Sequence, residues 1–347
     1  MNFKKLIGAG LIAAATLTGL GDTADAKTRM KLHSAWGQNL PILGTGAHGL
    51  ADKINTMSGN ELAVKVFEPG ALVGGTKYYD AVSQGSIDAG FGVSGYHVGK
   101  NPAYAFFSSV PFGPGAGEFL AWMRYGGGLE IAEEMFARDN IKYLVCGVIP
   151  PETSGWFKKP INSVEDLKGL KMRFFGLGAK VMEKFGVSTQ LLAGGDIYPA
   201  LELGTIDATE FSMPVVDKNI GFYQVAKHNY FPGWHQQTTL LELLVNMDKW
   251  KKLSKAEQAI ITTSCEAQTA NTFAEGEATQ FSAMLESQEK GVTIHRWSDE
   301  MIGHFEKAWK EVIAEEIADS EDSKRIWKSY SDFRENYKVW RKNGYLQ

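Results

Sequence analysis

The chain has 347 residues, of which 44% are hydrophobic and 22% are charged, and its formal net charge at pH 7 is −4. This composition is typical of a globular protein large enough for two lobes, and it excludes intrinsic disorder and low complexity. Charges of both signs are interspersed, so no basic stripe indicates nucleic-acid binding and no polybasic face indicates binding to anionic lipid. A partner is therefore expected in a pocket or on a protein surface.

The N-terminal segment has the three parts of a secretory signal peptide. Lys4 and Lys5 precede an apolar run over residues 6–20, and the small-residue site Ala24-Asp25-Ala26 follows. Because the run is shorter than the roughly 20 residues that span a bilayer, we expect cleavage near Ala26 rather than retention as an anchor. The sequence thus predicts a signal peptide over residues 1–26 and a mature protein in the periplasm.

An internal repeat organises the middle of the chain. Residues 75–89 align with residues 194–208 when Tyr79 is placed on Tyr198, and from Tyr79 onward six positions then match, including an Ile-Asp-Ala triplet in each copy. Chance would not readily keep six positions in register. We therefore interpret the two segments as copies of one structural unit.

Each copy is predicted to be a short helix that ends at a C′ glycine, Gly85 or Gly204, and leads into a strand that begins with the triplet. A further strand precedes each copy, over residues 61–67 and 188–192. Two such strand–helix–strand units predict two α/β lobes with parallel sheets covered by helices.

The same alternation of strands and helices continues up to about residue 240. Four further elements are predicted: a strand over 30–35, a helix over about 43–58, a strand over 171–175 and a helix over about 178–185. Two long helices follow, over about 256–288 and 299–317, the second with Ser298 as its N-cap. Late helices of this kind commonly run back across both lobes, which favours hinge closure around a ligand in the cleft.

In open parallel sheets a ligand binds beyond the carboxyl ends of the strands. Four segments lie there: 34–36, 92–97, 173–176 and 210–214. Arg173 ends a basic, apolar strand, and its planar guanidinium can make two parallel hydrogen bonds to a carboxylate. Composition alone favours a surface arginine paired with an acid.

Glu210 follows the second Ile-Asp-Ala triplet. A carboxylate beside a bound anion is unfavourable unless a cation lies between them. Hard cations such as calcium or sodium take oxygen ligands, so Glu210, Glu152 and Gln236 could form such a site. From spacing alone, an ordinary solvated acid is the simpler interpretation.

Aromatic residues, histidines and cysteines give weaker signals. Eight aromatic residues lie near the strand ends: Trp36, Tyr96, Phe106, Phe107, Trp156, Phe174, Phe175 and Trp234. We expect two or three of them to contact a ligand and the others to lie in the core. The seven histidines show no metal-binding spacing and are interpreted as single structural residues. An oxidising compartment would permit a disulfide between Cys146 and Cys265, but we predict two buried free thiols.

The sequence as a whole resembles the extracytoplasmic solute receptors of tripartite ATP-independent periplasmic (TRAP) transporters. Six stretches carry the resemblance: residues 99–103, 110–113, 152–161, 164–173, 194–210 and 234–235. It covers essentially the whole mature chain. It implies an α/β, two-lobed periplasmic-binding-protein fold (type II, Venus-flytrap) with long C-terminal helices that cross both lobes. The expected lobes are 27–150 with about 239–285, and 151–238 with about 286–347 as a helical extension.

Within that family, the chain is similar to the receptors that bind 2-oxo and 2-hydroxy monocarboxylates together with a metal ion. The resemblance implies that Arg173 binds the solute carboxylate. Six residues are expected to contact the solute: Trp36, Tyr96, Glu152, Arg173, Phe175 and Phe211. A small organic carboxylate and the TRAP membrane subunits are the expected partners.

The resemblance also implies a metal ion, sodium or calcium, held at positions 152, 210 and 236 and by the backbone carbonyl of residue 211. The chain departs from the family pattern at three of these positions: Glu152 replaces the usual glutamine, Gln236 the usual glutamate, and Phe211 the usual tryptophan. The first two changes exchange an acid and an amide, so the summed charge is preserved. We expect a retained metal site with altered geometry or preference, and Phe211 leaves the solute open.

The sequence therefore predicts a solute receptor and not an enzyme. The chain lacks a Gly-x-Ser-x-Gly elbow, a P-loop and a histidine–glutamate metal box. Two alternatives are a periplasmic metal-assisted lyase or isomerase, with Tyr96, His97 or Glu152 as its base, and a solute sensor for a membrane kinase. The aromatic and basic segment from about 327 to 346 suggests a homodimer through an exchanged helix, as the resemblance implies.

Overall fold

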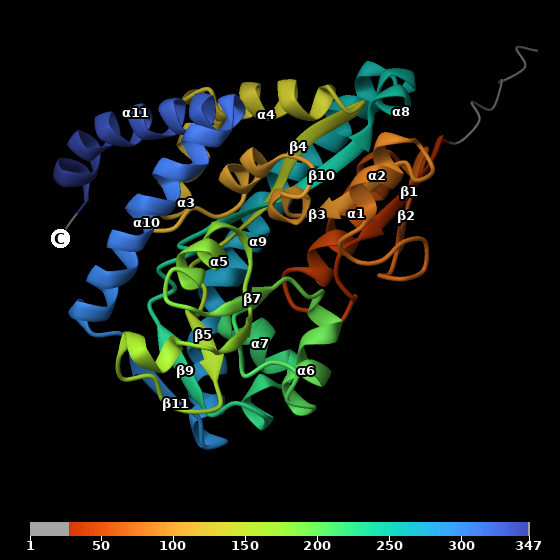
Figure 1. Cartoon of the computed structure of the whole chain (residues 1–347). Helices are drawn as coiled ribbons and strands as arrows, with labels where there is room; N and C mark the ends of the chain where they lie inside the picture. Colours follow the sequence, from red (N-terminus) through yellow and green to blue (C-terminus); the bar gives the residue numbers. More distant parts are fainter. Residues whose placement is uncertain (1–27, 346–347) are drawn as a thin grey trace, which may run out of the picture.

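The computed structural model describes residues 28–345, so the predicted signal peptide and its cleavage near Ala26 lie outside the described residues. Each of two lobes is built on one β-sheet (Figure 1). The first sheet has the order β2-β1-β3-β10-β4 and the second the order β11-β9-β5-β8-β6-β7. The strands are β1 (Thr28–Ser34), β2 (Leu62–Phe67), β3 (Ala89–Gly92), β4 (Ile141–Ile149), β5 (Gly155–Phe157), β6 (Lys171–Arg173), β7 (Ser188–Gln190), β8 (Ala208–Thr209), β9 (His228–Phe231), β10 (Thr239–Asn246) and β11 (Thr293–Arg296).

Helices cover both sheets and connect the lobes. The helices are α1 (Gly44–Met57), α2 (Tyr78–Ser83), α3 (Ala116–Tyr125), α4 (Gly128–Ala137), α5 (Gly176–Glu183), α6 (Gly194–Glu202), α7 (Pro214–Ile220), α8 (Met247–Lys252), α9 (Lys255–Glu289), α10 (Asp299–Asp319) and α11 (Glu321–Gly344), with the short 3₁₀ helices η1 (Ser94–His97), η2 (Pro102–Phe107), η3 (Val164–Leu167) and η4 (Phe222–Gln224). No helix within residues 28–345 is long and apolar enough to cross a membrane.

The predicted repeat folds as the same unit in both lobes. The aspartate of each triplet accepts a backbone hydrogen bond from the neighbouring strand, β1 or β6: Asp88 Oδ2 from Lys31 N at 2.7 Å, and Asp207 Oδ2 from Lys171 N at 3.0 Å. The C′ glycine after α2 and the one after α6 both have a φ of +73°, which glycine adopts at little cost. The aspartate of each Ile-Asp-Ala triplet thus links the strand that follows the helix to the neighbouring strand of its sheet.

Both sheets are mixed: the expected parallel pairing holds for β1 with β2 and β3, for β6 with β7 and β8, and for β9 with β11, but not for the remaining pairs. β10 runs antiparallel to β3 and β4, and β5 runs antiparallel to β8 and β9. These are the strands that the chain forms directly after passing from one lobe to the other. Because the chain enters each sheet at the edge where the parallel strands end, the new strand must run in the opposite direction.

The long C-terminal helices cross both lobes, as predicted. α9 contacts β4 and α1 in the first lobe and α7 in the second. α10 packs against α5 of the second lobe, whereas α11 turns back to α3, α4 and η2 of the first (Figure 1). Ser298 caps α10 by accepting a hydrogen bond from Met301 N, as expected. The exact lobe boundaries stay a prediction, and the contacts of α11 link the C-terminal extension to the first lobe.

The two cysteines form a disulfide, so the prediction of free thiols is wrong. Cys146 lies on β4 and Cys265 on α9, and their Cα atoms are 4.0 Å apart although 119 residues separate them in sequence. The packing of α9 on β4 brings them together. The bond ties the helix that spans both lobes to the first sheet.

Candidate functional site

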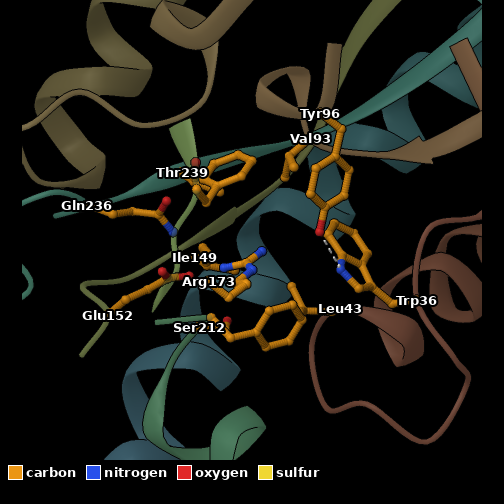
Figure 2. A pocket seen from close by; sticks show the side chains of 12 residues that line it. Trp36, Leu43, Val93, Tyr96, Ile149, Glu152, Arg173, Ser212, Gln236 and Thr239 are labelled. Atoms are coloured by element: carbon orange, nitrogen blue, oxygen red, sulfur yellow. Dashed lines mark hydrogen bonds between the residues drawn. The ribbon is translucent and has the colours of Figure 1, made fainter. Parts of the chain in front are cut away.

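A cavity with a volume of about 300 Å³ lies between the lobes, at strand ends of both sheets (Figure 2). It is lined by Trp36, Leu43, Val93, Tyr96, Ile149, Glu152, Arg173, Phe175, Phe211, Ser212, Gln236 and Thr239. All six residues expected to contact a solute are among them. The empty space is narrow, so the cavity suits only a small molecule.

The wall from the first lobe carries two aromatic residues that follow strands. Trp36 follows β1, and Tyr96 lies in η1 directly after β3. Trp36 Nε1 donates a hydrogen bond to Tyr96 Oη at 3.2 Å (Figure 2). Burial raises the pKa of Tyr96, so its hydroxyl stays protonated and can donate a hydrogen bond to a ligand. The Tyr96 ring also meets Phe175 of the second lobe edge-on, with centroids 5.5 Å apart.

A buried carboxylate holds the short helix that carries Tyr96. Glu242 on β10 accepts hydrogen bonds from Tyr78 Oη at 2.8 Å and from Ser94 Oγ, and its Oε1 lies 2.8 Å from His97 Nε2. Ser94 and His97 are the first and last residues of η1, which carries Tyr96. The sequence analysis missed Glu242, although a single acid inside an otherwise apolar strand was an available signal.

Arg173 ends β6 and is only 1% exposed, so the interpretation as a surface arginine is wrong. Its Nη1 donates to Glu210 Oε1 at 2.7 Å and to the Glu210 carbonyl at 2.8 Å, and its Nε donates to the Leu192 carbonyl at 3.3 Å. The guanidinium lies 5.1 Å from the centre of the Phe211 ring. Nη1 and Nε are thus committed, and Nη2 is the guanidinium nitrogen that donates no hydrogen bond within residues 28–345, so Nη2 by itself is available to a ligand in the cavity.

Glu210 is buried as well, which contradicts its interpretation as a solvated acid. Its Oε1 accepts a second hydrogen bond from Phe175 N at 2.5 Å. Burial alone would raise the pKa of Glu210, but the Arg173 guanidinium and His235 bring it below its ordinary value. Glu210 is therefore an ionised, buried carboxylate with one oxygen committed to Arg173.

Glu152 and Gln236 lie on the two segments by which the strands of one lobe continue into the other, 150–154 and 232–238. The segments touch, since Glu152 N donates to the Gln236 carbonyl at 3.3 Å and a Cβ on Gly233 would meet the Glu152 carbonyl oxygen at 2.2 Å. Burial, followed by the charges of Glu210 and Asp217, raises the pKa of Glu152 well above its ordinary value. A second ionised carboxylate in this position is destabilised by the negative charges around it unless a cation binds beside it.

Several buried polar atoms in this region have no hydrogen-bond partner among the described residues. They are Glu152 Oε2, Glu210 Oε2, Gln236 Oε1 and both ring nitrogens of His235. Such atoms are normally paired in a folded protein, so an unpaired set indicates a missing ligand. The oxygen donors fit the expected cation, because hard cations bind carboxylate and amide oxygens. The sequence analysis missed His235, which it interpreted as a structural histidine.

Residues 33–320 match the profile of DctP, the bacterial extracellular solute-binding protein family 7. The chain belongs to this family. It is 34% identical to a monocarboxylate 2-oxoacid-binding periplasmic protein from Nostoc sp. over 312 residues, which are 90% of this chain and 85% of the relative.

Two solved structures of TRAP solute-binding proteins are similar over most of their length. The protein from Bordetella bronchiseptica, a mixed-occupancy dimer with calcium and picolinate in one site, is 32% identical, with a TM-score of 0.89 over 91% of this chain and 94% of that one. The protein from Pseudoalteromonas atlantica, with bound sodium and pyruvate, is 31% identical, with a TM-score of 0.87 over 91% and 96%.

These likenesses confirm the predicted family, the two-lobed α/β fold and the role of a periplasmic TRAP solute receptor. The family and its neighbours are transport solute-binding proteins and not enzymes. The alternative of a lyase or isomerase is therefore not supported.

Proposed function

We propose that this receptor binds a small 2-oxo or 2-hydroxy monocarboxylate, with Arg173 on the carboxylate and a cation beside it. One observation carries the proposal: the buried Arg173 lines one small cavity together with Glu152 and Gln236, which each keep an unpartnered oxygen, and the unpartnered oxygen of Glu210 lies within 4.8 Å of Glu152. The Nostoc relative binds 2-oxoacid monocarboxylates, and the Pseudoalteromonas neighbour holds pyruvate with sodium.

In this proposal each residue has a separate task. Nη2 of Arg173 donates to the solute carboxylate, and the charge of the guanidinium is permanent. The Tyr96 hydroxyl donates to a second oxygen of the solute. The rings of Trp36, Phe175 and Phe211 cover the solute and exclude water, which strengthens both interactions.

Glu152, Glu210, Gln236 and the backbone carbonyl of Phe211 would hold the metal ion. When bound, sodium or calcium supplies the positive charge that allows two carboxylates to stand beside an anionic solute. Glu152 and Gln236 lie on the segments that join the lobes. A ligand bound to them therefore also favours closure of the lobes. The closed and open forms present different surfaces to the membrane subunits.

Calorimetry tests the proposal. Metal-stripped and calcium- or sodium-loaded protein is titrated with a 2-oxo acid, a 2-hydroxy acid and a sulfonate of similar size. We expect tight binding of one of the carboxylates by loaded protein, and a loss of about 30-fold or more in Arg173→Lys and Arg173→Ala, because a buried charged hydrogen bond is worth about 2–5 kcal/mol. The exposed Arg124, which pairs with Glu266, provides the control variant Arg124→Ala. Unchanged affinity in both Arg173 variants would sink the proposal.

We also propose that the receptor forms a homodimer through α11. The end of this helix exposes Val339, Trp340 and Tyr345, and the Bordetella neighbour is a dimer. Light scattering should give the mass of a dimer for the wild type and of a monomer for Trp340→Asp. A monomeric wild type at all concentrations would refute this part.

A further inference from the structure

We infer that Gly276 is a positioning residue of this receptor. It allows helix α9 to lie directly against Pro150, and this contact sets the path of the inter-lobe segment 150–154 in the arrangement that binds solute. The inference rests on the proposed function, because that arrangement is measured through solute binding. It gives a role in binding to a helix that contributes no side chain to the lining of the cavity.

Gly276 lies at a position where a helix normally disfavours glycine. It is the one glycine of α9, which is 35 residues long. Glycine in the interior of a helix is less favourable than alanine, because it loses more backbone freedom on folding. Gly276 does not have a positive φ, so no left-handed conformation requires a glycine there. The space available to a side chain must therefore explain the residue.

Pro150 fills the space beside Gly276. A Cβ on Gly276 would lie 2.5 Å from Pro150 Cδ and 2.9 Å from Pro150 Cγ, closer than real Cβ atoms come to other atoms. The proline ring is rigid and cannot turn away as a long side chain could. Gly303 on α10 is also a helical glycine, but a Cβ there would meet nothing within 4 Å. The close approach of the backbone is thus specific to Gly276.

Helix α9 is fixed to β4 as far as this contact. The disulfide joins the strand to the helix first. Two positions further along β4, Val148 N donates a hydrogen bond to Thr272 Oγ1 at 3.0 Å. Two positions beyond that, directly after the strand ends, Pro150 meets Gly276. The first half of α9 therefore belongs to the first lobe up to the start of the inter-lobe segment.

One turn later, α9 contacts the second lobe. Gln280 Nε2 donates to the Gly276 carbonyl at 2.6 Å, and Gln280 Oε1 accepts from Val215 N at 3.1 Å. Val215 lies in the first turn of α7, which packs on α9. The helix thus passes from contacts with one lobe to contacts with the other within the turn that begins at Gly276.

The inter-lobe segment passes between two positions without a side chain. Gly276 lies against it at Pro150, and Gly233 lies against it at Glu152, where a Cβ would come within 2.2 Å of the carbonyl oxygen. Because protein interiors are close-packed, a methyl group added at Gly276 displaces its neighbour. The disulfide holds α9 to β4, so the segment has to move, and the direction in which the chain enters the second lobe changes.

A double-mutant cycle tests the inference. Gly276→Ala, Pro150→Ala and the combined variant are titrated with pyruvate in the presence of sodium, the pair that the Pseudoalteromonas neighbour holds. We expect the affinity to fall about 10-fold or more in Gly276→Ala and to return to within about 3-fold of the Pro150→Ala value in the combined variant. Gly303→Ala, which adds the same methyl group to an open helical position, should leave the affinity unchanged.

The rescue separates positioning from a general effect on the helix. Alanine is the better helix former, so a loss that disappears when the ring of Pro150 is removed comes from the contact and not from α9 itself. Equal affinity of Gly276→Ala and wild type would overturn the inference, and so would an equal loss with and without Pro150. If Gly276→Ala does not fold, the combined variant is compared with Pro150→Ala alone. An affinity about 10-fold lower, or failure of the combined variant to fold, would then overturn it.

A measurement without solute keeps this inference distinct from the proposed function. Spin labels at Lys65→Cys in the first lobe and Lys159→Cys in the second, both exposed, report the arrangement of the lobes. Their distance distribution should change in Gly276→Ala and return toward that of Pro150→Ala in the combined variant. If no organic acid binds to the wild type, the proposed function fails, and the label distances alone test Gly276. Identical distances in wild type and Gly276→Ala would then overturn its role.

Discussion

The two walls of the cavity differ in whether their buried carboxylates have hydrogen-bond partners. In the first lobe, Glu242 is fully buried and accepts hydrogen bonds from Tyr78 and Ser94 beside His97. In the second lobe, Glu152 and Glu210 each keep a buried oxygen without a partner. Because buried polar atoms are usually paired, the first wall is complete as folded, whereas the second wall is completed by a ligand.

The difference also separates stability from function. A paired carboxylate adds rigidity to the element that it holds, here η1 with Tyr96. A buried unpaired carboxylate lowers the stability of the ligand-free fold. A ligand that pairs with it removes this penalty and therefore binds more tightly. Removal of a paired buried carboxylate should therefore lower the free energy of unfolding, whereas removal of an unpaired one should raise the stability of the ligand-free fold and weaken binding.

The largest effect on unfolding is expected at Glu242. Replacing it by Ala leaves Tyr78, Ser94 and His97 without their common acceptor in a buried place, which should lower the free energy of unfolding by about 3–5 kcal/mol. Glu242→Gln keeps the shape and one acceptor and should cost less. Urea denaturation measures both. A loss below about 1 kcal/mol in Glu242→Ala would show that the first wall does not depend on this network.

Glu152 should behave in the opposite manner. In metal-stripped protein the pKa of Glu152 is raised, so the folded chain keeps a proton that the unfolded chain loses above its ordinary value of 4.5. The stability of the fold therefore falls as pH rises from about 4.5 toward the raised pKa, by up to about 1.4 kcal/mol per pH unit. Glu152→Gln removes this contribution.

At pH 7 in the presence of a chelator, Glu152→Gln should thus be more stable than wild type by about 1 kcal/mol or more, and its metal affinity should be lower. Thermal unfolding from pH 5 to pH 8 gives the first quantity and calorimetry the second. Asp217, whose pKa burial also raises, is present in both proteins, so the difference between the two pH profiles reports Glu152 together with its electrostatic coupling to Asp217 and Glu210. Parallel profiles would show that Glu152 is ionised in the metal-free fold.

The sequence predicted the lobes because the repeat is local. Each strand–helix–strand unit is specified by neighbours in the chain, with its C′ glycine and its Ile-Asp-Ala triplet. The direction of β5 and β10 was missed because it depends on which edge of a sheet the chain enters, and no local pattern encodes that. The disulfide was missed for a related reason, since it depends on α9 packing against β4.

For the site, too, the local features were predicted and the contacts between distant segments were not. Arg173 and Glu210 were found because both follow predicted strands, where ligands bind in open sheets. Their pairing and burial were not predicted, since each looked like a surface residue by itself. Glu242 and His235 were missed because what marks them is the presence or absence of partners, and those partners come from distant segments: Tyr78 lies 164 positions from Glu242.

The smallest effect is expected at Tyr96, where the two walls meet. Its hydroxyl accepts from Trp36 Nε1 and retains a proton for the solute, so Tyr96→Phe should weaken solute binding by about 3- to 10-fold, the value of one neutral hydrogen bond. The ring remains, and with it the contact to Phe175, so the free energy of unfolding should fall by no more than about 1 kcal/mol, the value of the hydrogen bond that Trp36 Nε1 loses. Solute calorimetry and urea denaturation on the same preparation test both statements. A large loss of stability with unchanged affinity would mean that Tyr96 belongs to the supporting network of the first wall and not to the solute site.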